Sequence, residues 1–209
     1  MSQVYGSCPV SIEQLLLRWQ DVLAAATAQM STYNDLPYWY NERANVGYVA
    51  QAASALGWAV LEEYTVDRGK GKQKAPGRAD LWTGDSSGDE HEFEFKLYWP
   101  SIKSTDKTLA ENIEWYLDKA KFQLDQIKNK PGRRPHKVAM VFVCPSIARN
   151  DQRRWKNLLV RFENRVAQPR VYRSEFSAVF APPSHIPWQN RVGDDGYLYP
   201  AIAVFGKMV

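Results

Sequence analysis

The sequence has little of what several protein classes require. Only two cysteines, Cys8 and Cys144, occur among its 209 residues, which excludes a disulfide scaffold and a four-cysteine zinc site. Reduced thiols are the simplest interpretation, so we expect a cytoplasmic protein. No apolar run approaches the roughly 18 residues that a membrane-spanning helix needs. The N-terminus also lacks the charged start and apolar core of a signal peptide.

Several catalytic motifs are absent as well. The three histidines, at positions 91, 136 and 185, are too scattered for a metal triad. No serine or cysteine lies in a nucleophile motif. The basic segment GKGKQK lacks the spacing of the phosphate-binding loop G-x-x-x-x-G-K-[ST]. We therefore do not expect the chain to hydrolyse nucleoside triphosphates by itself.

What is present is the composition of an ordinary globular protein. Apolar residues make up 44% of the chain and charged residues 24%, which excludes a disordered or collagen-like chain. The length predicts one domain over residues 1–209. Lysine and arginine number 27 against 23 acidic residues, a net charge of +4. This mild basic excess is compatible with a polyanionic partner without requiring one.

Hydrophobic periodicity predicts an α/β protein. Apolar residues at steps of three and four indicate helices, strict alternation indicates half-buried strands, and the continuous apolar run VAMVFVC indicates a strand buried on both faces. We predict helices at 11–30, 37–56, 106–129 and 151–167, and strands at 58–66, 78–83, 90–99, 138–144, 175–181 and 196–205. The middle of the chain thus reads helix, three strands, helix, strand, an order that favours a mixed central sheet flanked by helices.

The strand at 90–99, EHEFEFKLYW, carries the most informative alternation. Phenylalanines at 93 and 95 point to one face, whereas Glu92, Glu94 and Lys96 point to the other. A solvated strand face with a Glu–Lys pair would show the same pattern, so alternation alone leaves both interpretations open.

Asp80, on the preceding strand, favours a site. If residues 86–88 form a three-residue turn, with Gly88 at its left-handed position, paired positions sum to 174 and Asp80 lies opposite Glu94. Cβ atoms of such a pair are roughly 5 Å apart. Two facing carboxylates repel each other, and a divalent cation such as Mg²⁺ would compensate for this. A register shifted by one residue would place Asp80 on the apolar face instead.

Lys96 and Glu42 add two more charged groups. Lys96 follows Glu94 by two residues on the same face, where an ammonium can orient or help deprotonate a water, or hold a phosphate oxygen. Glu42 lies four residues before Val46, in line with the apolar face of the helix at 37–56. An acid on that face usually has a partner. The alternative is an acid in the first helical turn, which the helix dipole favours.

Asp80, a spacer of 13 residues and then Glu94-Phe95-Lys96 resemble the signature of PD-(D/E)xK nucleases, the restriction-endonuclease-like superfamily. Glu42 is similar to the upstream helical acid of many members, and the element order resembles their αβββαβ core. The resemblance covers residues 37–144. We expect residues 1–36 to form an N-terminal helical extension, and residues 145–209 a C-terminal decoration with extra strands. The family's usual proline before the aspartate is Ala79 here.

The resemblance implies a nuclease that depends on Mg²⁺ or Mn²⁺. Asp80, Glu94 and the carbonyl oxygen of Phe95 would bind the metal, Lys96 would assist the attacking water, and Glu42 would complete the acidic pocket. We expect hydrolysis of DNA phosphodiester bonds, by an endonuclease rather than an exonuclease, with RNA as an alternative substrate. Cutting both strands of a duplex would favour a homodimer. Related nucleases often carry a polar residue on the following helix, which makes Gln126 a weak candidate.

Two basic loops flank the predicted site and are candidates for phosphate contacts. The loop at 67–78 carries Arg68, Lys70, Lys72, Lys74 and Arg78. The loop at 128–137 carries Lys128, Lys130, Arg133, Arg134 and Lys137. The alternative is that both loops are simply solvated.

Two rival functions remain open. The same fold could be a catalytically dormant module that only binds nucleic acid. The chain could also be a structural or interaction protein whose acidic strand is solvated.

Overall fold

A mixed seven-stranded sheet forms the centre of the computed structural model, which describes residues 3–33, 35–68, 75–128, 132–183, 186, 192–193 and 195–209. The strand order is β1-β6-β7-β5-β4-β3-β2. The β4–β5 pair is parallel, and the other neighbouring strands are antiparallel. The strands are β1 (Val4–Gly6), β2 (Ala59–Arg68), β3 (Ala75–Gly84), β4 (Glu90–Tyr98), β5 (His136–Val143), β6 (Phe176–Phe180) and β7 (Ile202–Met208). The predicted α/β class with a mixed central sheet is confirmed.

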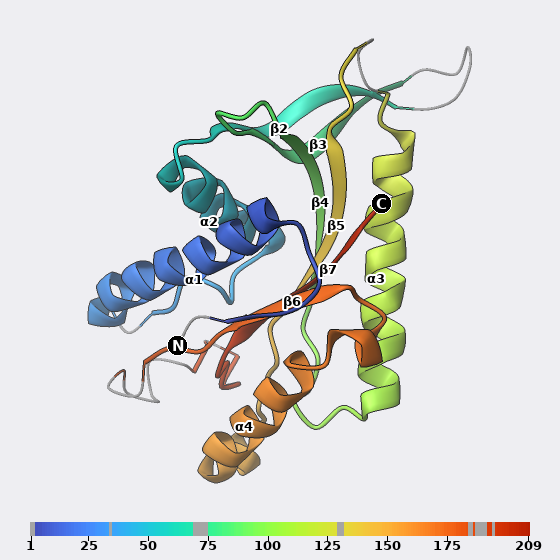
Figure 1. The fold of residues 1–209 in the computed structure, drawn as a ribbon. Helices are drawn as coiled ribbons and strands as arrows, with labels where there is room; N and C mark the ends of the chain where they lie inside the picture. Colours follow the sequence, from blue (N-terminus) through green and yellow to red (C-terminus); the bar gives the residue numbers. More distant parts are fainter. Residues whose placement is uncertain are drawn as a thin grey trace.

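Helices cover both faces of this sheet (Figure 1). Helices α1 (Val10–Met30) and α2 (Glu42–Ala55) pack on one face, whereas α3 (Asp106–Gln126) and α4 (Trp155–Val166) pack on the other. Among the described residues, the short 3₁₀ helices η1 (Ser31–Tyr33), η2 (Arg149–Arg154) and η3 (Pro169–Tyr172) lie between the longer elements. Each face therefore has its own hydrophobic layer, and the sheet separates the two.

The apolar pattern of the sequence explains these two layers. Residues 93 and 95 of β4 face α1 and α2 and are fully buried, as the alternation predicts. Strand β5 alternates Met140 and Phe142 toward that layer with Val141 and Val143 toward α3. All four side chains are fully buried. This confirms that the continuous apolar run forms a strand buried on both faces.

The predicted elements are present, with boundary differences that have local causes. Helix α2 begins at Glu42 and not at residue 37, because Asn41 is its N-cap and accepts a hydrogen bond from the Ala44 N–H at 2.8 Å. The last strand begins at Ile202, just beyond Pro200, and not at residue 196. Strand β1 spans only three residues, which is too short to leave a periodic signal.

The outward face of β4 is not solvated. Glu92 and Glu94 are 5% and 1% exposed, so the interpretation of this strand as a solvated acidic face is wrong. Helix α3 covers the strand on that side.

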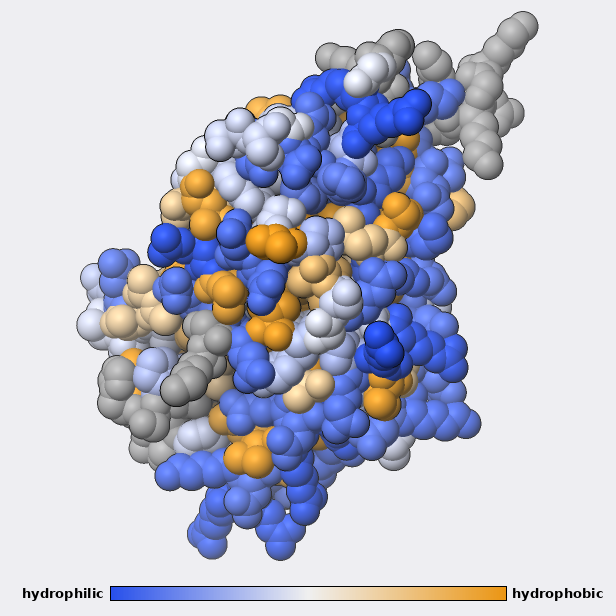
Figure 2. Space-filling view, viewed as in Figure 1, coloured by the Kyte–Doolittle hydropathy of each residue, from blue (hydrophilic) through white to orange (hydrophobic). Residues whose placement is uncertain are grey.

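The molecular surface in the view of Figure 2 is largely hydrophilic, with apolar residues in small separate groups. Every helix among the described residues is too short or too polar to traverse a lipid bilayer.

Candidate active site

The β3–β4 hairpin brings Asp80 and Glu94 together. Its paired positions, from Leu81–Phe93 to Gly84–Glu90, sum to 174, which is the predicted register. Gly88 has a φ of 92° in the turn, and its N–H bonds to the carbonyl oxygen of Asp85. The turn prediction and the register that follows from it are therefore confirmed.

Strand β3 separates from β4 where the site begins. The β3–β4 ladder ends at Leu81, whereas β4 continues along β5 to Tyr98. Beyond that end, the Phe95 N–H donates a 2.7 Å hydrogen bond to Oδ2 of Asp80. The opposite neighbour is also distorted, because Glu63 of β2 has a φ of 45° and is missing from the β2–β3 ladder across from Asp80. Backbone strain of this kind is concentrated at functional sites.

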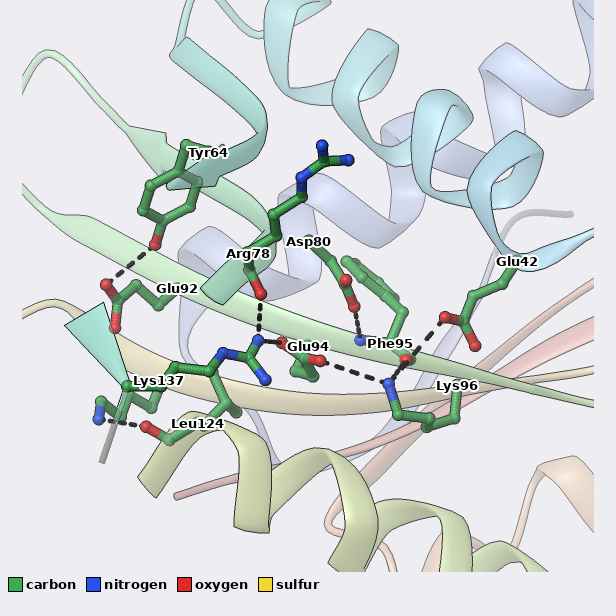
Figure 3. A network of polar contacts seen from close by, with 11 residues as sticks. Glu42, Tyr64, Arg78, Asp80, Glu92, Glu94, Phe95, Lys96, Leu124 and Lys137 are labelled. Carbon is green, nitrogen blue, oxygen red and sulfur yellow. Dashed lines mark hydrogen bonds and ion pairs between the residues drawn. The ribbon is translucent and has the colours of Figure 1, made fainter. Parts of the chain in front are cut away.

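The Glu94 carboxylate lies between two cations (Figure 3). Its Oε1 is 3.4 Å from Nζ of Lys96, and its Oε2 is 3.3 Å from Nη2 of Arg68. Burial, followed by the charge of Asp80, raises the pKa of Glu94 to about 7, and the two cations oppose that rise. A buried carboxyl group poised near neutral pH is typical of a functional site.

Lys96 links this carboxylate to Glu42. Its Nζ donates to the Phe95 carbonyl oxygen at 2.5 Å and lies 4.0 Å from Oε1 of Glu42 (Figure 3). Glu42 lies in the first turn of α2, where the helix dipole favours an acid. It also has a charged partner, Lys96, as expected for an acid that belongs to a site. Glu42 and Asp80 line one small cavity of about 60 Å³. The structure thus brings all four predicted catalytic residues together.

Burial also raises the pKa of Asp80 and of Glu42 above the usual carboxyl range. For Asp80, the hydrogen bond from Phe95 and the charge of Lys96 oppose the rise. For Glu42, the charge of Lys96 opposes it and that of Asp80 adds to it. Three carboxyl groups in one place therefore hold protons more tightly than they would in water.

Another buried acid, Glu92, lies on the same strand, and its partner was not predicted. Glu92 accepts a 2.9 Å hydrogen bond from the Tyr64 hydroxyl of β2 (Figure 3). Burial raises the pKa of Glu92. Alternation placed Glu92 on the face of Glu94, but nothing in the sequence pointed to Tyr64 as its partner.

The predicted phosphate-binding residues have different surroundings. Arg68 turns inward to Glu94 and to the carbonyl oxygen of Arg78. Arg78 itself pairs with Glu63 at 2.9 Å. Arg133 forms a fork of hydrogen bonds with Glu90 at the surface, and Arg134 is exposed. The predicted residues Lys70, Lys72, Lys74 and Lys130 lie outside the described residues.

Gln126 is the last residue of α3 and is half-buried. No hydrogen bond joins its side chain to the four charged site residues, all of which the structure describes. One turn earlier, Gln123 lines an open hollow together with Lys96. Gln123 therefore shares a hollow with one of the site residues.

Oxygen atoms suited to a hard cation converge beside Lys96. Within the part of the chain that the structure describes, no three His, Cys, Asp or Glu side chains form a ligand group for one metal ion. The Lys96 ammonium, however, is close to both the Phe95 carbonyl and the Glu94 carboxylate.

Comparison of the chain with protein-family models, with curated proteins and with solved structures finds no match. A functional assignment therefore depends on this geometry.

Proposed function

We propose that this protein is a divalent-metal-dependent nuclease that hydrolyses DNA phosphodiester bonds. One observation carries the proposal. Glu94 is 1% exposed and lies beside a second carboxylate, Asp80, with a lysine two residues along the same strand. Two adjacent carboxylates, one of them buried, cost folding stability, and a bound cation would offset that cost. The order α2, β2, β3, β4, α3, β5 supports the proposal, because it is the αβββαβ order of the nucleases that the sequence resembles.

The donor atoms fit a hard cation. Carboxylate and carbonyl oxygens are the ligands that Mg²⁺ and Mn²⁺ prefer, with waters and substrate phosphate completing the shell. In the structure, the oxygens of Glu94 and Phe95 already hold one positive charge, the Lys96 ammonium. Asp80, Glu94 and the Phe95 carbonyl would hold the metal. When bound, such a metal would stabilise negative charge on the phosphate and lower the pKa of a bound water.

The chain's own side chains would position the reacting groups. Lys96 can donate hydrogen bonds to the attacking water or to a phosphate oxygen, since its side chain keeps 17% of its surface exposed. Glu42, 4.0 Å from Lys96, completes the acidic pocket. Arg68 neutralises part of the Glu94 charge, which limits the repulsion between the two acids before substrate arrives.

Arg68 also favours a second candidate function. Its guanidinium already pairs with the buried Glu94 carboxylate, as it would in a dormant module that binds nucleic acid without cleaving it. The two candidates differ in one property, since only the nuclease requires a divalent cation for an activity.

Asp80→Asn tests the nuclease. An asparagine oxygen can still accept the Phe95 N–H, so the variant removes charge and keeps the hydrogen bond. In chelator, we expect it to melt at the parent temperature or slightly above, because repulsion worth about 0.2–1 kcal/mol is relieved. With Mn²⁺ the order should reverse, since the parent alone gains binding energy. Nicking of a supercoiled plasmid should need Mg²⁺ or Mn²⁺ and be lost in the variant.

Asp21→Asn is the matched control. Asp21 is exposed on α1 and pairs weakly with Arg18. This variant should cleave like the parent and gain the same stability from Mn²⁺. Binding of DNA without metal-dependent cleavage by the parent would support the dormant module instead.

Lys96→Ala separates catalysis from binding. We expect plasmid cleavage to fall by about 10²-fold or more, the usual contribution of a positioned proton-transfer group. Affinity for DNA in chelator, measured by gel shift, should stay within about threefold, because one ammonium among many basic groups contributes little to phosphate binding. Full cleavage by this variant would exclude a catalytic role for Lys96.

A further inference from the structure

Helix α3 carries large aromatic side chains on its solvent side. Trp115 is 51% exposed and Phe122 is 66% exposed. They lie seven residues apart, with Lys119 between them, so all three share one face of the helix. The opposite face of α3 packs on the sheet. Neither aromatic side chain therefore has a role in the core.

These side chains border an open hollow of about 590 Å³ that leads to the candidate active site. Trp115, Lys119 and Phe122 line it together with Lys96 of β4. Aromatic contacts join the two ends. Tyr116 packs edge-on against Trp115, with 4.7 Å between ring centroids, and its ring is tilted against that of Tyr98 at 5.3 Å. The exposed aromatic surface is thus continuous with the strand that carries Lys96.

Two lysines and one acid line this hollow. The Lys119 ammonium lies 3.4 Å from the centroid of the Trp115 ring. Lys96 is the second cation, and its ammonium also contacts Glu94 and Glu42. The acid in the hollow, Asp118, is paired with Lys207 at 2.7 Å. Aromatic rings interleaved with cations suit a ligand that alternates flat rings with negative charges, which is the chemistry of unpaired nucleotides.

We propose that this hollow binds unpaired nucleobases. The proposal rests on the proposed function and names its substrate class: the nucleic acid is single-stranded, or locally unpaired, beside Lys96. Trp115 and Phe122 stack on bases, and Lys119 contacts the phosphates between them. A duplex, whose bases stack only on each other, leaves these two side chains unused.

The test is binding of two fluorescent probes in chelator, a 20-nucleotide oligothymidylate and a 20-base-pair duplex. Trp115→Ala and Phe122→Ala should each weaken binding of the single strand by about tenfold, since stacking contributes this order of affinity for each base. Binding of the duplex should change less than twofold. Trp115→Phe should retain most of the affinity for the single strand, because it keeps an aromatic face.

Tyr33→Ala is the control, since Tyr33 is 82% exposed and lies on η1, away from α3. It should bind both probes like the parent. Equal losses for single strand and duplex, unchanged binding in both α3 variants, or no binding of the single strand by the parent would each overturn the proposal. So would a change in sedimentation that shows α3 to be a contact between two copies of the chain.

The outcome is independent of the nuclease proposal, because no metal is present in the binding assay. Loss of single-strand affinity in Trp115→Ala, without metal-dependent cleavage by the parent, would uphold the hollow and remove the nuclease. Cleavage that persists with unchanged binding in both α3 variants would do the reverse.

Discussion

The Glu94 carboxyl group makes the stability of the protein depend on pH. Its pKa is raised from 4.5 to about 7 in the fold. The folded state therefore holds a proton that the unfolded chain releases. This stabilisation is fully present below about pH 4.5 and is lost as pH rises through about 7. Each pKa unit of difference corresponds to about 1.4 kcal/mol.

Glu94→Gln should remove this pH dependence. We expect the melting temperature of the variant, relative to the parent in chelator, to rise by several degrees between pH 5 and pH 8, at about 2–4 °C for each kcal/mol. With Mn²⁺ the difference should shrink or change sign, because a cation favours the ionised carboxylate. Thermal melts across this pH range measure it. A constant difference, or an equal trend in the exposed control Asp21→Asn, would contradict it.

At this scale the sequence predicted the acids better than their partners. Alternation along β4 and the hairpin turn were enough to place Asp80, Glu94 and Lys96 on one side, because both signals are local. The inward turn of Arg68 was not predictable. Its partners, Glu94 and the Arg78 carbonyl oxygen, belong to two other strands, and no local pattern encodes such pairings. The partner Tyr64 of Glu92 was missed for the same reason.

The β3–β4 hairpin holds its two carboxylates in register through one turn. A substitution of the glycine in that turn tests how much the turn contributes to stability. Gly88 has a φ of 92° with open space around it, so a Cβ there meets no atom and the cost is backbone strain alone. Gly88→Ala should destabilise the protein by about 1–2 kcal/mol, which lowers the melting temperature by about 2–8 °C.

Gly47→Ala is the same chemical change with the opposite expected sign. Gly47 lies within α2, where an added Cβ has room. Alanine is favoured over glycine in a helix by about 1 kcal/mol. The melting temperature should therefore rise. If both variants destabilise the protein equally, the strain at Gly88 is not the cause.

Whole elements were more predictable than their ends. The helix at 106–129 is present as α3 because its buried residues repeat over about four turns, from Leu109 to Leu124. The predicted start of α2, at residue 37, was wrong because the aromatic residues before Asn41 extend the apolar pattern but are not helical. Strand β1 was not predicted because it forms by pairing with β6, which is far away in the sequence.

The distribution of basic residues over the molecule predicts how its binding to nucleic acid responds to salt. The arginines at 78 and 133 are engaged by acids, so phosphate contacts there would first break ion pairs. Neutralising Lys70, Lys72 and Lys74 together should weaken binding to all sequences alike. It should also reduce the slope of log K against log salt by up to about 2.1 for a single strand, at about 0.7 for each lost phosphate contact, and by up to about 2.7 for a duplex, at about 0.9 for each.

A second triple variant controls for net charge. Neutralising Arg18, Lys107 and Lys156 removes the same charge from helices α1, α3 and α4. Titration of DNA at several salt concentrations should show a smaller change in slope. A loss confined to one DNA sequence in the first variant would indicate base readout instead.

The strand order has a consequence for how the chain assembles. The hairpin that holds Asp80 and Glu94 is closed by residues 85–89 alone, whereas β1 must find β6 across the length of the chain. Short-range pairings form early and long-range ones late. We therefore expect the two acids to meet while they are still hydrated, when repulsion between unit charges 4 Å apart is only about 1 kcal/mol. The energetic conflict of the site then arises late in folding, when α3 closes over a hairpin that is already formed.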